Sequence, residues 1–135
     1  MQNELYPSPD PELSRKRREL APDAAAAFAA FSKQVFADGA LPARTKQLIA
    51  VAVAHVTQCP YCIRGHTRGA LRAGASEAEI MEAIWVAAEM RAGGSYAHSI
   101  IALSEMERVE SAEPGLHGAT KTGEDHGRQA EPVTP

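Results

Sequence analysis

The fold is decided by residues 46–74, which read KQLIAVAVAHVTQCPYCIRGHTRGALRAG. The stretch from Leu48 to Val56 is apolar almost all round, which is typical of a helix that its own fold or another subunit covers on most sides. A second helix is predicted to begin near Cys59, because Pro60 suits a first helical turn and Gly74 suits a left-handed C-terminal cap. The pattern thus predicts a central helix followed directly by a helix that carries two cysteines.

A further helix is predicted before the central one. Residues 22–37 are rich in alanine, and Phe28 and Phe31 are spaced to contribute to one apolar face. Asp38-Gly39 is a turn signal that ends this helix. Since Pro42 suits a first turn, the central helix is predicted over residues 42–57.

Two more helices are predicted after the one with the cysteines. Ser76 and Glu79 form a capping box, in which each side chain satisfies a free backbone N–H group of the other residue, and this motif opens a helix that ends near Arg91. Gly93-Gly94 is predicted to separate that helix from a last one, which ends near Val109.

The composition favours an all-α subunit. Apolar residues make up 44% of the chain and aromatic residues only 5%, so the core is built from small side chains that suit closely packed helices. A length of 135 residues allows one domain of ordinary size. We expect an N-terminal arm over residues 1–20, a helical domain over residues 21–110 and a disordered tail over residues 111–135, where Gly, Pro, Thr and charges replace large apolar side chains.

Charge and hydropathy exclude several kinds of partner. The 14 Lys and Arg residues nearly balance the 17 Asp and Glu residues, so no basic field exists to attract nucleic acid. No apolar run reaches the roughly 20 residues of a membrane span. The N-terminus lacks the basic region and the apolar run of a secretion signal. We therefore expect a cytoplasmic protein with no nucleic-acid or membrane partner.

Cys59, Cys62 and His66 form the motif C-x-x-C-x-x-x-H, and on a helix their side chains fall within one narrow stripe. Helical Cα atoms three residues apart lie about 5 Å from each other, which allows the thiols to form a reversible disulfide. The helix start favours a thiolate at Cys59, and His66 can take or share the proton of Cys62. A thiolate that attacks a peroxide becomes a sulfenic acid, and a second cysteine condenses with it to a disulfide. The motif predicts a thiol peroxidase, for which we expect no cofactor and no metal.

The same residues allow other interpretations. The cysteines can be small buried apolar residues, and His66 can be a core histidine. A zinc site could use both cysteines, His66 and His55, although a tetrahedral site seldom takes three ligands from one continuous helix stripe. His55 is either a second proton carrier or a core histidine bonded to a backbone carbonyl. His98 is better explained as structural or interfacial, and His117 and His126 as solvated residues of the tail.

Residues 41–103 resemble the core of the AhpD-like alkylhydroperoxidases in the carboxymuconolactone decarboxylase superfamily. The resemblance rests on the C-x-x-C-x-x-x-H motif, the apolar helix before it and the G-A-S-x-x-E-I segment after it. It implies an all-helical subunit that is an obligate homo-oligomer, a trimer or a hexamer. It also implies that Cys62 attacks the hydroperoxide, that Cys59 resolves the product and that His66 belongs to a proton relay. A dihydrolipoyl or thioredoxin-like protein would then reduce the disulfide.

Gln47 departs from the family pattern, which commonly has a glutamate twelve positions before the first cysteine. An amide cannot take a proton at neutral pH. Either Gln47 only orients a water or His66, or His55 takes over as the base, or the activity is weak. Tyr61 likewise stands where a second family variant has a histidine between the cysteines.

The leading prediction is a thiol-dependent peroxidase that reduces alkyl hydroperoxides, with Cys62 as nucleophile, Cys59 as resolving thiol and His66 as general base. Gln47 and His55 support the base in this scheme. A lyase of the carboxymuconolactone decarboxylase type, acting through His66, would keep its activity without the cysteine pair. A non-enzymatic redox sensor or scaffold would change its assembly with the state of the disulfide and show no turnover.

Overall fold

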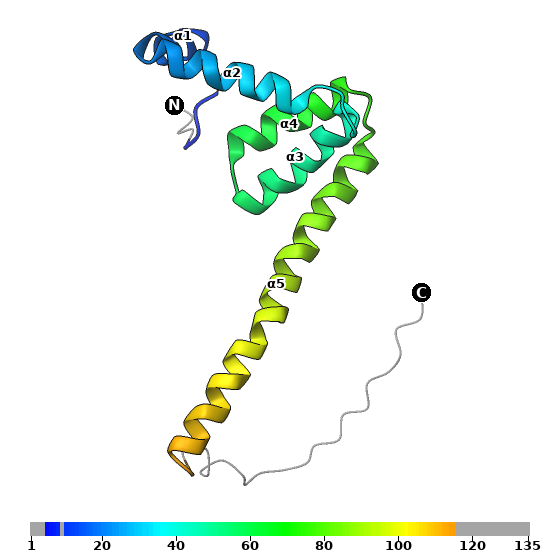
Figure 1. Ribbon diagram of the computed structural model, residues 1–135. Coiled ribbons are helices and arrows are strands. Elements are labelled where there is room, and N and C mark those ends of the chain that lie inside the picture. The colour runs from blue at the N-terminus through cyan, green and yellow to red at the C-terminus, as the bar shows by residue number, and fades with distance from the viewer. Residues whose placement is uncertain (1–4, 9, 116–135) are drawn as a thin grey trace. The chain divides into compact units, whose positions relative to one another are not determined.

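The computed structural model describes residues 5–8 and 10–115, and every regular element within them is an α-helix (Figure 1). This confirms the all-α prediction for the described part of the chain. The chain divides into two compact units after Gly94, and each is described by itself. The helices are α1 (Pro11–Leu20), α2 (Pro22–Phe36), α3 (Ala43–Thr57), α4 (Pro60–Arg72) and α5 (Glu77–Ala112).

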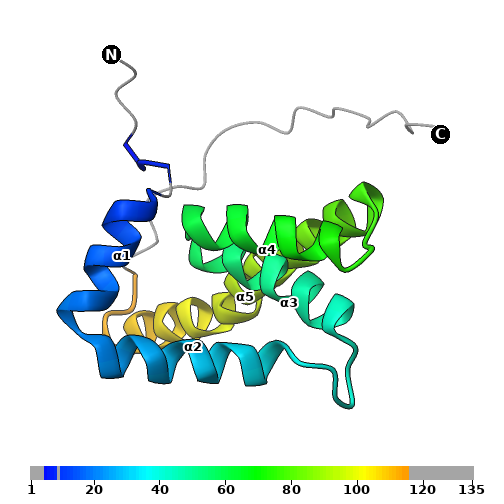
Figure 2. The same ribbon diagram turned by 90° about the horizontal axis from the view of Figure 1, so that it is seen from above.

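Helices α3 and α4 form a hairpin around the small core of the first unit (Figures 1 and 2). Val51 on α3 and Ala70 on α4 are both fully buried, and Ala75 and Ile80 complete the cluster. Because alanine has a minimal side chain, the two backbones can approach closely at Ala70. The hairpin is the scaffold of the residues discussed below.

The turn between α3 and α4 is set by backbone geometry. Gln58 ends α3 in the left-handed region, with φ of 55°. Cys59 is the N-cap of α4, and Pro60 occupies its first turn, as predicted. Gly74 has φ of 86° just after the helix, which confirms the predicted left-handed cap.

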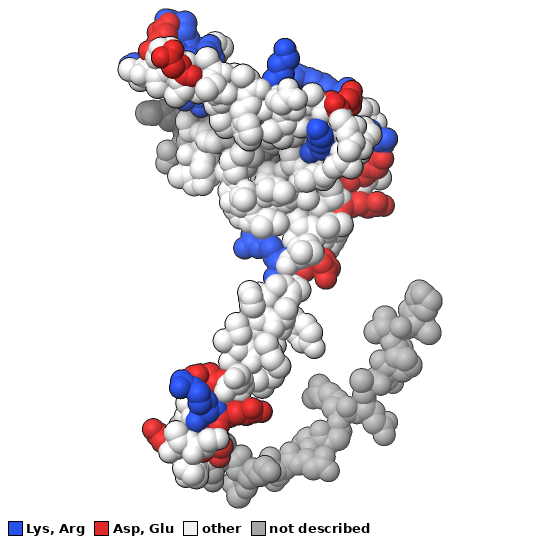
Figure 3. All heavy atoms as spheres, in the orientation of Figure 1, with Lys and Arg blue, Asp and Glu red and all other residues white. Residues whose placement is uncertain are grey.

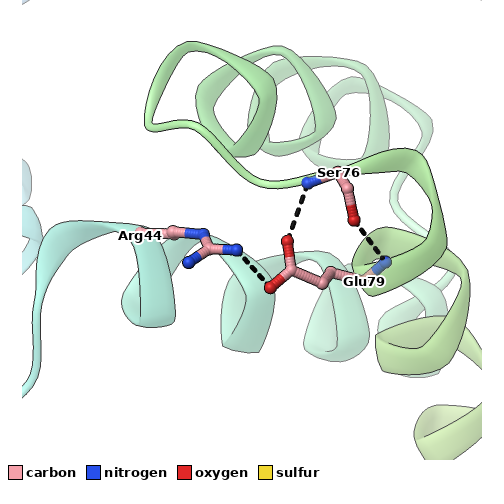
Figure 4. Close-up of polar contacts among 3 residues, drawn as sticks. All are labelled: Arg44, Ser76 and Glu79. Atoms are coloured by element: carbon pink, nitrogen blue, oxygen red, sulfur yellow. Dashed lines mark hydrogen bonds and ion pairs between the residues drawn. The ribbon is translucent and has the colours of Figure 1, made fainter.

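The start of α5 is fixed by the predicted capping box (Figure 4). The backbone N–H of Ser76 donates to Glu79 Oε2 at 2.8 Å, and the backbone N–H of Glu79 donates to Ser76 Oγ at 3.2 Å. The other oxygen of Glu79 accepts from Arg44 in the first turn of α3. The capping box therefore also joins the beginnings of α3 and α5.

The predicted break at Gly93-Gly94 is wrong, because α5 runs without interruption from Glu77 to Ala112. Neither glycine has a positive φ. A glycine in a helix interior costs about 1 kcal/mol relative to alanine, and the strong helix formers on both sides outweigh that cost. The boundary between the two compact units still falls directly after Gly94.

The N-terminal part contains a helix that the sequence analysis did not predict. Residues 11–20, the second half of the predicted arm, form α1. Asp10 caps it, since its Oδ1 accepts from the backbone N–H of Glu12 at 2.7 Å. Helix α2 ends one residue before the predicted end, and α3 begins one residue after Pro42.

Helix α5 reaches two residues into the predicted tail, because it ends at Ala112. Residues 116–135, with His117 and His126, lie outside the described part, and so does most of the predicted tail. Within the described residues no helix is both long enough and apolar enough to cross a membrane.

Candidate functional site

The two cysteines lie at the start of α4 with their sulfur atoms in contact. Cys59 Sγ and Cys62 Sγ are 2.6 Å apart and share a hydrogen bond, and both residues are free thiols. Cys59 Sγ also accepts from the backbone N–H of Cys62 at 3.3 Å, and it thereby serves as the N-cap of the helix. The spacing of the motif on one helix thus brings the two thiols together, as the sequence analysis predicted.

The two thiols differ in acidity. The hydrogen bond with the Cys62 side chain and the bond from the Cys62 backbone N–H both lower the pKa of Cys59. The shared side-chain hydrogen bond raises the pKa of Cys62, and burial and the negative charge of Cys59 raise it further. A thiolate therefore forms first on Cys59, and Cys62 keeps its proton until a base removes it.

His66 lies one turn after Cys62 and is held from two sides. Its Nδ1 is 2.9 Å from Gln47 Oε1 on α3. Its ring stacks on Phe36 of α2, with centroids 5.0 Å apart and the planes inclined by 29°. Because an amide oxygen only accepts, the hydrogen bond to Gln47 puts the proton on Nδ1 and leaves Nε2 free to accept one.

Gly69 makes room for Gln47 and was missed by the sequence analysis. A Cβ atom at this position would lie 2.5 Å from Gln47 Oε1 and 2.7 Å from Gln47 Cδ. Contacts this short force the amide to move. A glycine three residues after His66 on the same helix was the available signal, because interior helical glycines cost stability and usually have a packing reason.

A cavity of about 430 Å³ opens beside the second cysteine. Its walls come from α2, α3 and α4 and are mostly apolar, with Cys62 and His66 among them. A neighbouring hollow of about 360 Å³ on the α2 side shares both of these residues. The cavity is lined by Val35, Phe36, Lys46, Ile49, Ala50, Val53, Ala54, Thr57, Cys62 and His66.

Lys46 fixes one wall of this cavity and was also missed. Its Nζ donates to the backbone carbonyls of Val35 at 2.9 Å and Ala37 at 2.6 Å. These carbonyls lie at the C-terminal end of α2, where a cation satisfies groups that the helix leaves unbonded. These two hydrogen bonds hold the end of α2 in place, and this segment carries the Phe36 ring that stacks on His66.

His55 lies apart from this arrangement. Its Nδ1 is 2.8 Å from the carbonyl oxygen of Val51 on its own helix, and it does not line the cavity. The bond to a backbone carbonyl is the one that the core-histidine interpretation expects, although His55 is only half-buried. His98 belongs to the second unit and is exposed. Among the described residues, no three His, Cys, Asp or Glu side chains gather in a way that could hold a metal ion.

Comparison with known proteins identifies the family. The model of the carboxymuconolactone decarboxylase family matches residues 22–105. The chain belongs to the carboxymuconolactone decarboxylase family. The match covers α2, α3, α4 and most of α5, and it confirms the resemblance inferred from the cysteine motif.

Three proteins similar to this family member each match about two thirds of the chain. Protein 4 in the cox locus of Paracoccus denitrificans is 67% identical over 86 residues, which is 64% of this chain and 78% of that protein. A carboxymuconolactone decarboxylase family protein from Legionella pneumophila is 32% identical, with a TM-score of 0.57 over 72% of this chain and 87% of that one. A protein from Methanobacterium thermoautotrophicum with a crystal structure is 38% identical. Its TM-score is 0.58, and the match covers 62% of this chain and 93% of that one.

Proposed function

We propose that this member of the carboxymuconolactone decarboxylase family is a thiol-dependent peroxidase that reduces alkyl hydroperoxides through a Cys59–Cys62 dithiol/disulfide cycle. One observation carries the proposal: two free thiols lie 2.6 Å apart at a helix start, and one of them opens on a largely apolar cavity. A cavity of this kind suits the alkyl group of an organic hydroperoxide.

Cys62 is the proposed nucleophile because it lines the cavity together with His66. The raised pKa of Cys62 means that its thiol needs a base. His66 Nε2 takes the proton in this scheme, and Gln47 and Phe36 hold the ring in place. Gln47 is thus a positioning residue, and His55 has no part in the proposed scheme.

The reaction balances in two steps. The Cys62 thiolate attacks the terminal peroxide oxygen, the O–O bond breaks, and the alkoxide leaves as an alcohol with the proton that His66 took. The Cys59 thiolate then attacks the sulfenic sulfur, the S–O bond breaks and the disulfide forms. Hydroxide leaves and becomes water with the proton that Cys59 had released to the solvent. The lowered pKa of Cys59 suits this second step, because its thiolate is available without a base. An external dithiol, on a dihydrolipoyl or thioredoxin-like protein, returns two electrons and two protons.

The working protein is proposed to be a cytoplasmic homotrimer or homohexamer. Large apolar side chains are exposed on several helices, among them Phe28, Phe31, Trp85, Tyr96 and Ile100. Soluble monomers rarely expose so much apolar surface, and burial between subunits would remove it from water.

The test is the reaction of the reduced protein with cumene hydroperoxide in a stopped-flow instrument, with the loss of free thiols as readout. We expect rapid loss of two thiols per chain and sustained turnover with a dithiol reductant. Cys62→Ser should abolish both the reaction and the sulfenic acid. Cys59→Ser should still form sulfenic acid, which a dimedone probe detects, and lose turnover.

Two results would contradict the proposal. Full turnover in Cys62→Ser would show that Cys62 is not the nucleophile. Thiol loss no faster than in a simple model dithiol would mean that the pair is not activated. Activity on a lactone acid that survives Cys59→Ser would instead establish the lyase after which the family is named.

A further inference from the structure

Helix α4 carries only positive charge. It contains Arg64, Arg68 and Arg72 and no Asp or Glu between Pro60 and Arg72. Arg64 and Arg68 are four residues apart, so their side chains share one side of the helix, and like charges at this spacing destabilise it. Figure 3 shows Lys and Arg side chains gathered along the upper edge, where Figure 1 shows α4. An anion bound between the two side chains would relieve this repulsion.

Arg64 and Arg68 line a recess of about 260 Å³ between α1 and α4, here called the arginine recess. A third guanidinium enters it from Arg17 on α1. Two hydroxyl-bearing side chains also line the recess. Among the residues that the structure describes, no carboxylate lines it. The full lining is Ser14, Arg17, Tyr61, Arg64, Gly65 and Arg68.

The three arginines of the recess are unpaired within the described chain. Other arginines do find carboxylates: Arg15 pairs with Glu19, Arg44 with Glu79 and Arg108 with Glu105. No described carboxylate forms an ion pair with an arginine of the recess. Guanidinium groups present planar donor forks that match a carboxylate, so three of them around one recess form a receptor for such a group.

The recess and the dithiol share the start of α4, and the recess does not open into the peroxide cavity. Tyr61, which lies between Cys59 and Cys62 in the sequence, forms part of its wall. The Tyr61 ring is held edge-on by Tyr6, with centroids 6.2 Å apart. The apolar cavity, in contrast, is walled by α2 and α3 together with Cys62 and His66. An anionic group in the recess would therefore contact Tyr61, which lies between the two cysteines in the sequence, without entering the cavity.

We propose that the arginine recess binds the carboxylate of a small dithiol reductant and thereby guides its thiol to the Cys59–Cys62 disulfide. The inference rests on the proposed function, because it concerns the half-reaction that restores the thiols. A recess of this size takes a short carboxylated chain. Such a small dithiol would act in addition to the dihydrolipoyl or thioredoxin-like protein proposed above.

The reduction step balances as follows. One thiolate of the reductant attacks a sulfur of the disulfide, the protein S–S bond breaks, and a mixed disulfide forms. The second thiol of the reductant attacks that bond and leaves with the first as a cyclic disulfide. Two electrons and two protons pass from the reductant to Cys59 and Cys62.

The test compares dihydrolipoate with dihydrolipoamide, which have the same dithiol and differ only in the remote carboxylate. The full-length protein is first oxidised with diamide, and the rate of thiol recovery is measured at low ionic strength. Dihydrolipoate should react about tenfold faster than the neutral amide. The difference should shrink as salt is added, because exposed charges are screened.

Variants show whether the recess causes this preference. The double variant Arg64→Gln/Arg68→Gln should react equally with both reductants and keep the wild-type rate with dihydrolipoamide. Arg72→Gln is the matched control, since it removes a charge from the same helix outside the recess, and it should keep most of the preference. Equal rates in the wild type, or an unchanged preference in the double variant, would overturn the inference.

The two proposals fail separately. Oxidation with diamide makes the disulfide without a peroxide. If the protein does not react with cumene hydroperoxide but prefers dihydrolipoate, only the peroxidase proposal fails. If the protein turns over cumene hydroperoxide but shows no preference between the two reductants, only the proposal for the arginine recess fails.

Discussion

Gln47 reaches His66 only because α4 has no side chain at Gly69. The amide contacts the ring nitrogen at 2.9 Å, and a Cβ at Gly69 would occupy the space of the amide oxygen. The sequence analysis named Gln47 and His66 and left open whether the first orients the second. The sequence alone does not decide this, because the two residues are 19 positions apart and lie on two different helices.

Gly69→Ala should displace Gln47 and weaken the reaction of Cys62 with cumene hydroperoxide by about tenfold, the effect of losing one hydrogen bond. Thermal stability should change little, since the helix gains propensity from alanine while the contact is lost. Stopped-flow thiol loss measures the first effect and calorimetry the second.

Gly65→Ala is the control, because a Cβ there meets nothing within 4 Å. It should keep the wild-type rate and raise the melting temperature. Equal rates in the two variants would show that the amide does not serve the reaction.

The opposite shifts in the pKa values of the two thiols predict a pH order of reactivity. Cys59 should titrate below the usual range of a thiol, and Cys62 above it. Labelling of the reduced protein with iodoacetamide should therefore begin at Cys59 as the pH rises, since only the thiolate reacts. Peptide mass spectrometry at a series of pH values measures this order, and earlier labelling of Cys62 would reverse the assignment.

At the scale of the helices, local signals were predicted well and context-dependent ones were not. The Ser76–Glu79 capping box and the cap at Gly74 depend on residues within one turn, so the sequence alone contains them. Gly93-Gly94 is different, because a glycine pair is a turn or a helix segment according to what surrounds it. Phe36 and Lys46 were missed because their contacts join different helices: Phe36 stacks on His66 of α4, and Lys46 of α3 bonds to the end of α2.

Gly94→Ala tests the continuity of α5. Gly94 is helical and a Cβ there meets nothing within 4 Å, so alanine should stabilise the protein by up to about 1 kcal/mol. The measurement is the free energy of unfolding in urea. A loss of stability would mean that the backbone at this point needs a conformation that only glycine adopts easily.

At the scale of the whole molecule, the described chain buries few side chains. Its only fully buried large side chain is Val51, while Trp85 is 70% and Tyr96 83% exposed. From the sequence, the apolar central helix could be covered by its own fold or by another subunit, and a homo-oligomer was implied by the family resemblance. The exposed apolar residues on α2 and α5 favour a partner subunit.

Sedimentation equilibrium should give three or six times the chain mass of 14.4 kDa. Ile100→Glu should lower that mass, because a charge would enter the buried interface. Arg108→Glu is a suitable control on an exposed part of the same helix. A wild-type mass of one chain would refute the homo-oligomer.

Cys59 serves as the N-cap of α4 only while its sulfur is free to accept from the Cys62 N–H. A sulfur in a disulfide has lost the negative charge that makes it a good acceptor, so oxidation weakens the helix start. By thermodynamic linkage, an interaction present only in the dithiol form raises the reduction potential of the pair. The fold itself thus favours return to the dithiol, and a modest donor in a reducing compartment would suffice to reset it.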